Sequence, residues 1–156
     1  MSLGIGDRGE PFMQIDGDGV FVVPVTENNE IIMIVEPSVI TRVSVLGLPA
    51  GVIDPGETSR ESANRELQEE SGYKSEQLDY LGRLQPFSRH SNWQIDVYLG
   101  RKLVPSKLIG DESYDIASKR YRFDQIEDAL AAGEIDDSNV ISALYLARIY
   151  LERERA

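Results

Sequence analysis

The chain has 156 residues, enough for one well-buried core and too few for two ordinary domains, so we expect residues 1–156 to form a single domain. Its 27 acidic and 16 basic residues give a formal net charge of −11, which argues against nucleic-acid binding because phosphate backbones are bound by clustered Lys and Arg. Absence of cysteine excludes disulfides and thiolate chemistry. No apolar run could span a membrane and no export signal is recognised, so we expect a cytoplasmic protein without a membrane partner.

β-branched and alternating runs predict strands at residues 19–25, 31–35, 41–46, 78–84, 94–103 and 121–123. The polar turn at residues 27–30 predicts that the first two strands form a hairpin. Helical spacing predicts helices over residues 59–71, from 124 to about 133, and a last helix capped by Asp137 or Ser138. This mostly β order with three helices predicts an α+β fold or an α/β/α sandwich. No strand is predicted before residue 19. For residues 1–18 we expect a vector-derived remnant, a shortened N-terminal region or the start of a naturally compact domain.

Capping signals delimit the helix predicted over residues 59–71. Thr58 followed by Glu61 forms a capping box, in which each residue satisfies a backbone donor near the start of the helix. Gly72 follows the last periodic residue and suits the left-handed backbone conformation that glycine adopts at low cost. The helix therefore begins and ends within this segment.

Three carboxylates, from Glu66, Glu69 and Glu70, share one stripe of this helix. Like charges at this spacing repel, so the stripe is best explained by a bound hard cation. Oxygen ligands favour Mg²⁺, with Mn²⁺ as the alternative. The same spacing assigns the other faces: Ala63 and Leu67 toward the protein, Asn64 and Gln68 toward solvent.

The segment resembles the Nudix box, whose pattern is Gly, five residues, Glu, seven residues, Arg-Glu, an aliphatic, one residue, Glu-Glu, one residue and Gly. The matching positions are Gly51, Glu57, Arg65, Glu66, Leu67, Glu69, Glu70 and Gly72, and Tyr73 stands where the pattern has a final aliphatic residue. The resemblance implies the Nudix fold, in which helices enclose a mixed β-sheet. It also implies a hydrolase that uses divalent metal ions.

In this family, the three box carboxylates and a main-chain carbonyl just before the box bind metal, which implies Glu66, Glu69, Glu70 and Ala50 here. The resemblance also implies a catalytic role for Glu69, which it would perform as a metal ligand. Glu57 and Arg65 correspond to a structural pair that orients the helix, with Gly51 supporting the site.

A general base is expected in the acidic loop at residues 110–116, which is similar to a loop of ADP-ribose hydrolases in this family. Glu112 is the first candidate, and Asp111 and Asp115 are the alternatives. His90, the single histidine, is a weaker candidate for proton transfer.

The substrate is inferred from resemblance outside the box. Residues 48–51 and 133–136 are similar to ADP-sugar hydrolases, including ADP compounds hydrolases that accept ADP-ribose, NADH and diadenosine polyphosphates. The expected reaction converts ADP-ribose to AMP and ribose 5-phosphate. The alternatives are a Nudix hydrolase acting on nucleoside triphosphates, or a non-catalytic nucleotide-sensing module, which the intact carboxylates disfavour.

The chain departs from these relatives around the substrate. Many of them carry an arginine where residues 36–38 read Glu-Pro-Ser here, leaving Arg42 or Arg89 as candidate phosphate contacts and Trp93 or Phe87 as candidates for stacking on a base. Most also have further N-terminal strands that exchange between subunits and contribute to the adenine pocket, and we expect part of that pocket to be absent. The last helix adds apolar residues beyond one stripe, which suggests a homodimer: Tyr145, Ile149 and Tyr150.

Overall fold

In the computed structural model, which describes residues 1–38, 40–41, 43–110 and 116–156, the strands of these ranges form three sheets. The elements in chain order are β1 (Ser2–Ile5), β2 (Pro11–Gln14), β3 (Gly19–Pro24), β4 (Glu30–Pro37), β5 (Ser44–Gly47), β6 (Ala50–Val52), α1 (Ser59–Glu66), the π-helical turn η1 (Leu67–Ser71), β7 (Tyr73–Leu84), β8 (Ile95–Pro105), β9 (Ala117–Arg122), α2 (Phe123–Ala131) and α3 (Ser138–Glu154). The predicted α+β class is confirmed.

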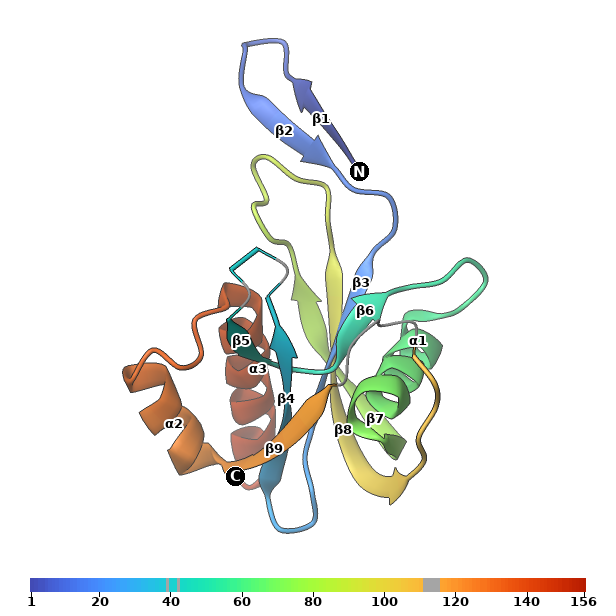
Figure 1. Cartoon of the computed structure of the whole chain (residues 1–156), viewed down its shortest axis with the longest axis vertical. Coiled ribbons are helices and arrows are strands. Elements are labelled where there is room, and N and C mark those ends of the chain that lie inside the picture. The colour runs from blue at the N-terminus through green and yellow to red at the C-terminus, as the bar shows by residue number, and fades with distance from the viewer. Residues whose placement is uncertain (39, 42, 111–115) are drawn as a thin grey trace.

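The largest sheet has the order β6-β3-β8-β7, and it is mixed because β3 and β8 run parallel while the other pairs are antiparallel. Side chains alternate between its faces. Val20 and Val22 pack in one hydrophobic cluster with Leu67, beneath α1. Val23 packs in the other cluster, which contains buried residues of α3. Helices therefore cover both faces, with α1 on one side and α3 on the other (Figure 1).

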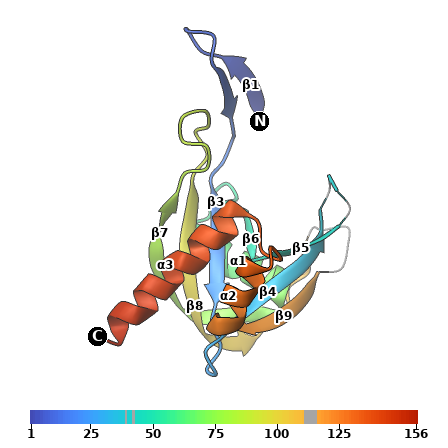
Figure 2. The ribbon, with the colours of Figure 1, turned by 90° about the vertical axis from the view of Figure 1, so that its left-hand side faces the viewer.

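The second sheet has the order β5-β4-β9 and is antiparallel. Ile31 and Met33 of β4 are fully buried and join one core with residues of β3, β8, α2 and α3. Seen from the side of α3, that helix lies across the larger sheet while α2 lies by β4 (Figure 2). The principal core is thus shared by both sheets and the two C-terminal helices.

The predicted hairpin between the first two core strands is only partly correct. Its turn is present, with Asn29 in the left-handed conformation at φ 57° and an antiparallel bridge between Val25 and Ile31. Beyond this bridge the strands separate, because β3 pairs with β6 and β8 whereas β4 pairs with β5 and β9. The turn therefore connects the two sheets.

The N-terminal region contains a hairpin where no strand was predicted. β1 pairs with β2 from Ser2 opposite Gln14 to Ile5 opposite Pro11, and the hairpin projects from the rest of the protein (Figure 1). Most of its side chains are exposed. A strand with one buried face shows alternating apolar and polar residues, and this alternation is weak here because neither strand of the hairpin has a buried face.

Both predicted signals at the ends of the box helix are confirmed. Thr58 and Glu61 form the capping box, and Gly72 has a left-handed φ of 78°. The predicted extent of this helix, residues 59–71, is also confirmed, but its last turn, Leu67–Ser71, is π-helical. π-turns inside helices often occur at functional sites, and this one carries Glu69 and Glu70.

Several other boundaries differ from the prediction. β7 begins earlier, at Tyr73, β9 is longer than the predicted strand, and β6 was not predicted. α2 begins at Phe123, one residue before the predicted start, while Asp137 caps α3 as predicted. None of the helices in the described ranges has the length and apolarity needed to cross a membrane.

Candidate active site

The three box carboxylates lie at the end of α1 and in η1, largely shielded from solvent. The side chains of Glu66 and Glu69 are 8% and 13% exposed, and Glu70 is 7% exposed. Acidic side chains are rarely buried to this extent without partners. The segment is therefore not an ordinary solvated acidic helix face.

Arg65 is the cation at the centre of this group. Its Nε donates to both carboxylate oxygens of Glu57 at 3.2 Å, and its Nη1 donates to Glu66 at 2.7 Å and to Glu69 at 3.1 Å. Its Nη2 donates to the carbonyl of Val52 at 3.1 Å. Burial lowers the pKa of Arg65, but the hydrogen bonds to Glu57 and Glu66 outweigh it and raise this pKa overall. Arg65 is therefore a permanent cation that connects two box carboxylates to Glu57.

Glu57 is held in its charged form. The hydrogen bond from Arg65 lowers the pKa of Glu57 most, and a short hydrogen bond from the fully buried Ser62 hydroxyl lowers it further. The ion pair predicted between Glu57 and Arg65 is thus present, and it lies across the loop that leads into α1. This geometry suits a pair that orients the helix.

β6 contacts the same carboxylates from the other side. The backbone N–H of Ala50 donates to Glu70 at 2.9 Å, and the carboxylate of Glu66 lies against Gly51. A β-carbon on Gly51 would overlap that carboxylate well inside van der Waals contact. Gly51 is therefore required by close approach, since only glycine leaves room for Glu66.

The C-terminal end of the helix is attached to the segment that follows β8. The hydroxyl of Ser106 donates to the side chain of Gln68 at 2.8 Å, and Lys107 donates to the main-chain carbonyl of Glu69. Asn64 is also engaged, because its side chain makes hydrogen bonds with the backbone N–H and carbonyl of Ser75 at 2.9 and 3.0 Å. The prediction that Asn64 and Gln68 face solvent is wrong.

The donor chemistry of the site fits a hard divalent cation. Three carboxylates and the carbonyl of Ala50 are all oxygen donors, which Mg²⁺ and Mn²⁺ prefer. Within the described ranges, no three acidic or histidine side chains converge as a ready-made metal cage. Mg²⁺ usually binds through one or two carboxylates together with waters and substrate phosphates, so an incomplete protein cage suits it.

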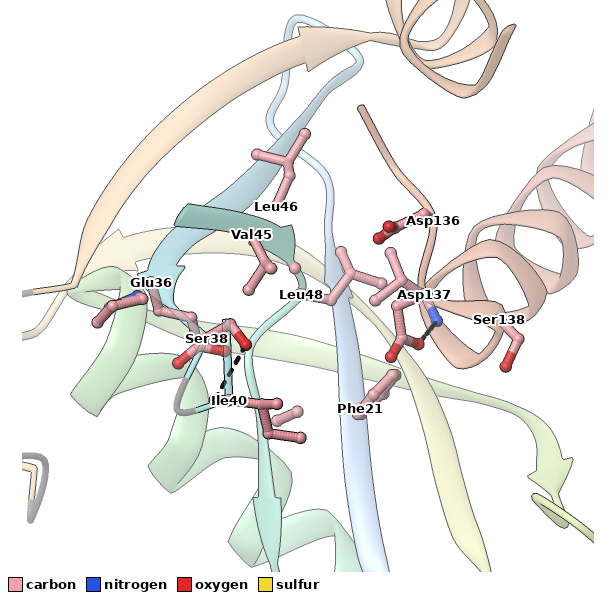
Figure 3. Close-up of a pocket in the computed structure, with 14 residues that line it drawn as sticks. Phe21, Glu36, Ser38, Ile40, Val45, Leu46, Leu48, Asp136, Asp137 and Ser138 are labelled. Atoms are coloured by element: carbon pink, nitrogen blue, oxygen red, sulfur yellow. Dashed lines mark hydrogen bonds between the residues drawn. The ribbon is translucent and has the colours of Figure 1, made fainter. Parts of the chain in front are cut away.

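A cleft of about 680 Å³ adjoins this site at Ala50. Apolar surface comes from Phe21 of β3, from Leu48 between β5 and β6, and from Val140 of α3. Glu36 of β4 contributes a carboxylate. Figure 3 shows Asp136 and Asp137 on the side of the cleft opposite Glu36 and Ser38. The cleft is large enough for a nucleoside, and its border at Ala50 connects it to the box carboxylates.

The residues predicted to contact the substrate or to transfer a proton lie elsewhere or are not described. Arg89 and His90 line a surface hollow with β2, and His90 Nδ1 is 2.8 Å from the carbonyl of Pro11. Trp93 packs beside Gly19. None of these three lines the cleft at Ala50. Phe87 is 74% exposed and lines a surface hollow with residues of the N-terminal hairpin, away from the cleft at Ala50. Four further candidates fall outside the described residues: Arg42, Asp111, Glu112 and Asp115.

One polar cluster on the α1 face of the larger sheet was missed by the sequence analysis. Asp96 is 7% exposed and accepts hydrogen bonds from Arg83 at 2.8 Å and Tyr80 at 3.2 Å. Burial raises the pKa of Asp96, but the hydrogen bonds from Arg83 and then Ser59 lower it overall. The available signal was an aspartate between Ile95 and Val97 in an apolar strand, since buried aspartates are rare unless they are paired.

Known proteins resemble this chain in both sequence and structure. Residues 16–144 match the family model described as NUDIX domain. The ADP compounds hydrolase NudE of Escherichia coli (strain K12) is 32% identical over 135 residues, which cover 86% of this chain and 72% of that protein. The methanol dehydrogenase activator of Bacillus methanolicus is 39% identical over 62 residues, covering 40% of this chain and 34% of that protein. A crystal structure of an ADP compounds hydrolase superimposes with a TM-score of 0.85 at 29% identity, covering 95% of this chain and 82% of that one.

Proposed function

This chain belongs to the Nudix family and is a Nudix pyrophosphohydrolase, and from that premise we propose that it hydrolyses the pyrophosphate of ADP-ribose to AMP and ribose 5-phosphate. NADH and diadenosine polyphosphates are further substrates of the same kind, a nucleoside diphosphate linked to another moiety. The predicted fold and family are confirmed. The observation that carries the proposal is the shielded group of Glu66, Glu69 and Glu70 beside a nucleoside-sized cleft.

Nudix hydrolases generally use divalent metal ions, and we propose Mg²⁺ here, with Mn²⁺ as a substitute. Glu66, Glu69, Glu70 and the carbonyl of Ala50 would hold it. When bound, such ions neutralise phosphate charge and lower the pKa of a coordinated water. Arg65 orients Glu66 and Glu69 through the hydrogen bonds described above, and Gly51 leaves room for Glu66.

We also propose where the substrate lies and which residue is the general base. The adenosine occupies the cleft beside Ala50, where Phe21 and Leu48 offer apolar surface to the base, and the diphosphate lies toward the box carboxylates. Glu112 activates the attacking water as general base, with Asp111 and Asp115 as alternatives. This assignment keeps the nucleoside and the phosphates in separate parts of the site.

The test is product release from ADP-ribose, NADH, diadenosine triphosphate and nucleoside triphosphates with Mg²⁺, for the wild type and Glu69→Gln. We expect AMP from ADP-ribose and a loss of at least about a hundredfold in the variant, because a carboxylate ligand is removed. Glu76→Gln, an exposed change on β7, is the matched control and should keep full activity.

The other outcomes decide between the alternatives. Turnover of triphosphates without turnover of ADP-ribose would keep the enzyme and overturn the substrate. Binding of a nucleotide without turnover of any compound would favour the sensing module.

We also propose a homodimer in which the N-terminal hairpin contributes to the interface. Large apolar side chains of this hairpin are exposed, including Leu3 at 78% and Ile5 at 70%, and Tyr145 of α3 is 63% exposed. Exposed apolar surface of this kind commonly marks a protein interface. Sedimentation at micromolar concentration should give a dimer, and a monomer at all concentrations would exclude it.

A further inference from the structure

We infer that Gln68 is a positioning residue for the metal site: its side chain holds the π-turn η1 in place and thereby sets where the carboxylates of Glu69 and Glu70 lie. The inference rests on the proposed function, because it concerns the same metal site. Gln68 carries no charge and is not one of the proposed metal ligands. It acts through the backbone that presents its two neighbours.

The first observation is the change of helix type at Leu67. In an α-helix each carbonyl accepts from the N–H four residues later, and in a π-helix from the N–H five residues later. A carbonyl near the junction of the two types can therefore lose its regular partner. The α-helical partner of the Asn64 carbonyl would be the N–H of Gln68, which lies inside η1. The carbonyl of Asn64 is thus next to this junction.

The side chain of Gln68 supplies a hydrogen bond at the junction. Its Nε2 donates to the carbonyl of Asn64 at 2.8 Å, and the backbone N–H of Leu67 also donates to this carbonyl. The side chain of Asn64 is in turn fixed to β7, because it accepts from the N–H of Ser75 at 2.9 Å and donates to the carbonyl of Ser75 at 3.0 Å. The amide of Gln68 therefore connects the π-turn to a residue that the larger sheet holds in place.

The other end of the same amide is held by the segment that follows β8. Gln68 Oε1 accepts from the hydroxyl of Ser106 at 2.8 Å, and the backbone N–H of Ser106 donates to the carbonyl of Gly72 at 2.9 Å. Figure 1 shows this segment passing beside the helix. Because the amide donates at one end and accepts at the other, one orientation of the side chain satisfies both partners. A rotation of η1 would have to break both hydrogen bonds.

This restraint matters because both neighbours of Gln68 are proposed metal ligands. Glu69 accepts from Arg65 at 3.1 Å, and Glu70 accepts from the backbone N–H of Ala50 at 2.9 Å. Metal ligands have to be held in a narrow geometry, and loss of a group that supports them commonly lowers metal affinity about 10- to 100-fold. A shift of the π-turn would move both carboxylates together. Loss of the Gln68 amide should therefore weaken metal binding without removing a ligand.

The experiment measures the Mn²⁺ affinity of the full chain by electron paramagnetic resonance. Gln68→Met keeps the length of the side chain and removes both amide hydrogen bonds, so we expect Mn²⁺ to bind about tenfold more weakly. Gln77→Met is the matched control, because Gln77 is a half-buried glutamine whose amide donates to Asp79 on the same strand, β7. The control should keep wild-type Mn²⁺ affinity, and thermal unfolding checks that both variants fold.

A second variant tests the same restraint from its other end. Ser106→Ala removes the hydroxyl that donates to Gln68, and we expect a smaller loss of Mn²⁺ affinity. In the double variant with Gln68→Met this further loss should disappear, because the hydroxyl acts through the amide. Additive losses would contradict the inference. If Gln68→Met does not fold, Ser106→Ala alone decides, and wild-type Mn²⁺ affinity in it would overturn the inference.

Turnover of ADP-ribose, measured on the same samples, separates this inference from the proposed function. Wild-type Mn²⁺ affinity in Gln68→Met would overturn the inference and leave the hydrolase intact. Equal losses of affinity in Gln68→Met and Gln77→Met would also overturn it, because they would reflect general destabilisation. A loss confined to Gln68→Met, in a protein that does not hydrolyse ADP-ribose, would support the inference while the proposed substrate fails.

Discussion

The carboxylate of Glu66 lies against the backbone of Gly51, in the space that a β-carbon at residue 51 would occupy. Gly51→Ala should therefore displace Glu66 from its place beside Arg65. We expect metal affinity to fall about 10- to 100-fold, the usual effect of disturbing the support of a ligand. Mn²⁺ titration followed by electron paramagnetic resonance measures this directly.

The control for that change is Gly19→Ala, on the neighbouring strand β3. A β-carbon there would meet its nearest neighbours at 3.4 Å, an ordinary contact. Metal affinity should be unchanged in this variant. Wild-type affinity in Gly51→Ala would contradict the assigned role of Gly51.

Stability at acidic pH should depend on Glu57. Arg65 and then Ser62 lower the pKa of Glu57 from its ordinary value of 4.5. A depressed folded-state pKa stabilises the protein above the ordinary value, and this contribution is lost as pH falls through the lowered pKa. Glu57→Gln should reduce the free energy of unfolding by about 1 to 2 kcal/mol at pH 7. Urea unfolding across pH should show this difference shrinking below pH 4.5, and a constant difference would argue against the ion pair as its source.

The buried Asp96 and the half-exposed Arg83 should be energetically coupled. Asp96→Asn removes a charge that accepts from both Arg83 and Tyr80, and we expect a loss of about 1 to 3 kcal/mol in unfolding free energy. A double-mutant cycle with Arg83→Gln isolates the pair. Because the side chain of Arg83 is 50% exposed, the coupling should weaken with added salt. Simple additivity of the two changes would show that the pair contributes nothing.

Lys107 should support the metal site from the C-terminal end of the helix. It donates to the main-chain carbonyl of Glu69, so Lys107→Met leaves that end of η1 less constrained. We expect a loss of metal affinity of several-fold with little change in thermal stability, because the side chain is exposed. Lys74→Met, an exposed change on β7, is the control. Equal metal affinity in both variants would remove Lys107 from the support of the site.

The features that can be predicted from the sequence alone are local in the chain. The capping box at Thr58 and the left-handed Gly72 depend on neighbouring residues, and the structure has both. The carboxylate stripe of Glu66, Glu69 and Glu70 likewise follows from spacing within one helix. Such features are readable because their partners lie within a few positions along the chain.

The groups that surround that stripe come from distant parts of the chain and are brought together only by folding. Ala50 donates to Glu70 across 20 positions of sequence, and Asp136 reaches the same cleft as Glu36 from the far end of the chain. The π-turn at Leu67–Ser71 carries hydrogen bonds to the segment after β8, which helical periodicity does not encode. The N-terminal hairpin buries too little surface to leave an alternating pattern. These features depend on which distant backbone and side-chain groups come into contact on folding, and no local pattern specifies those partners.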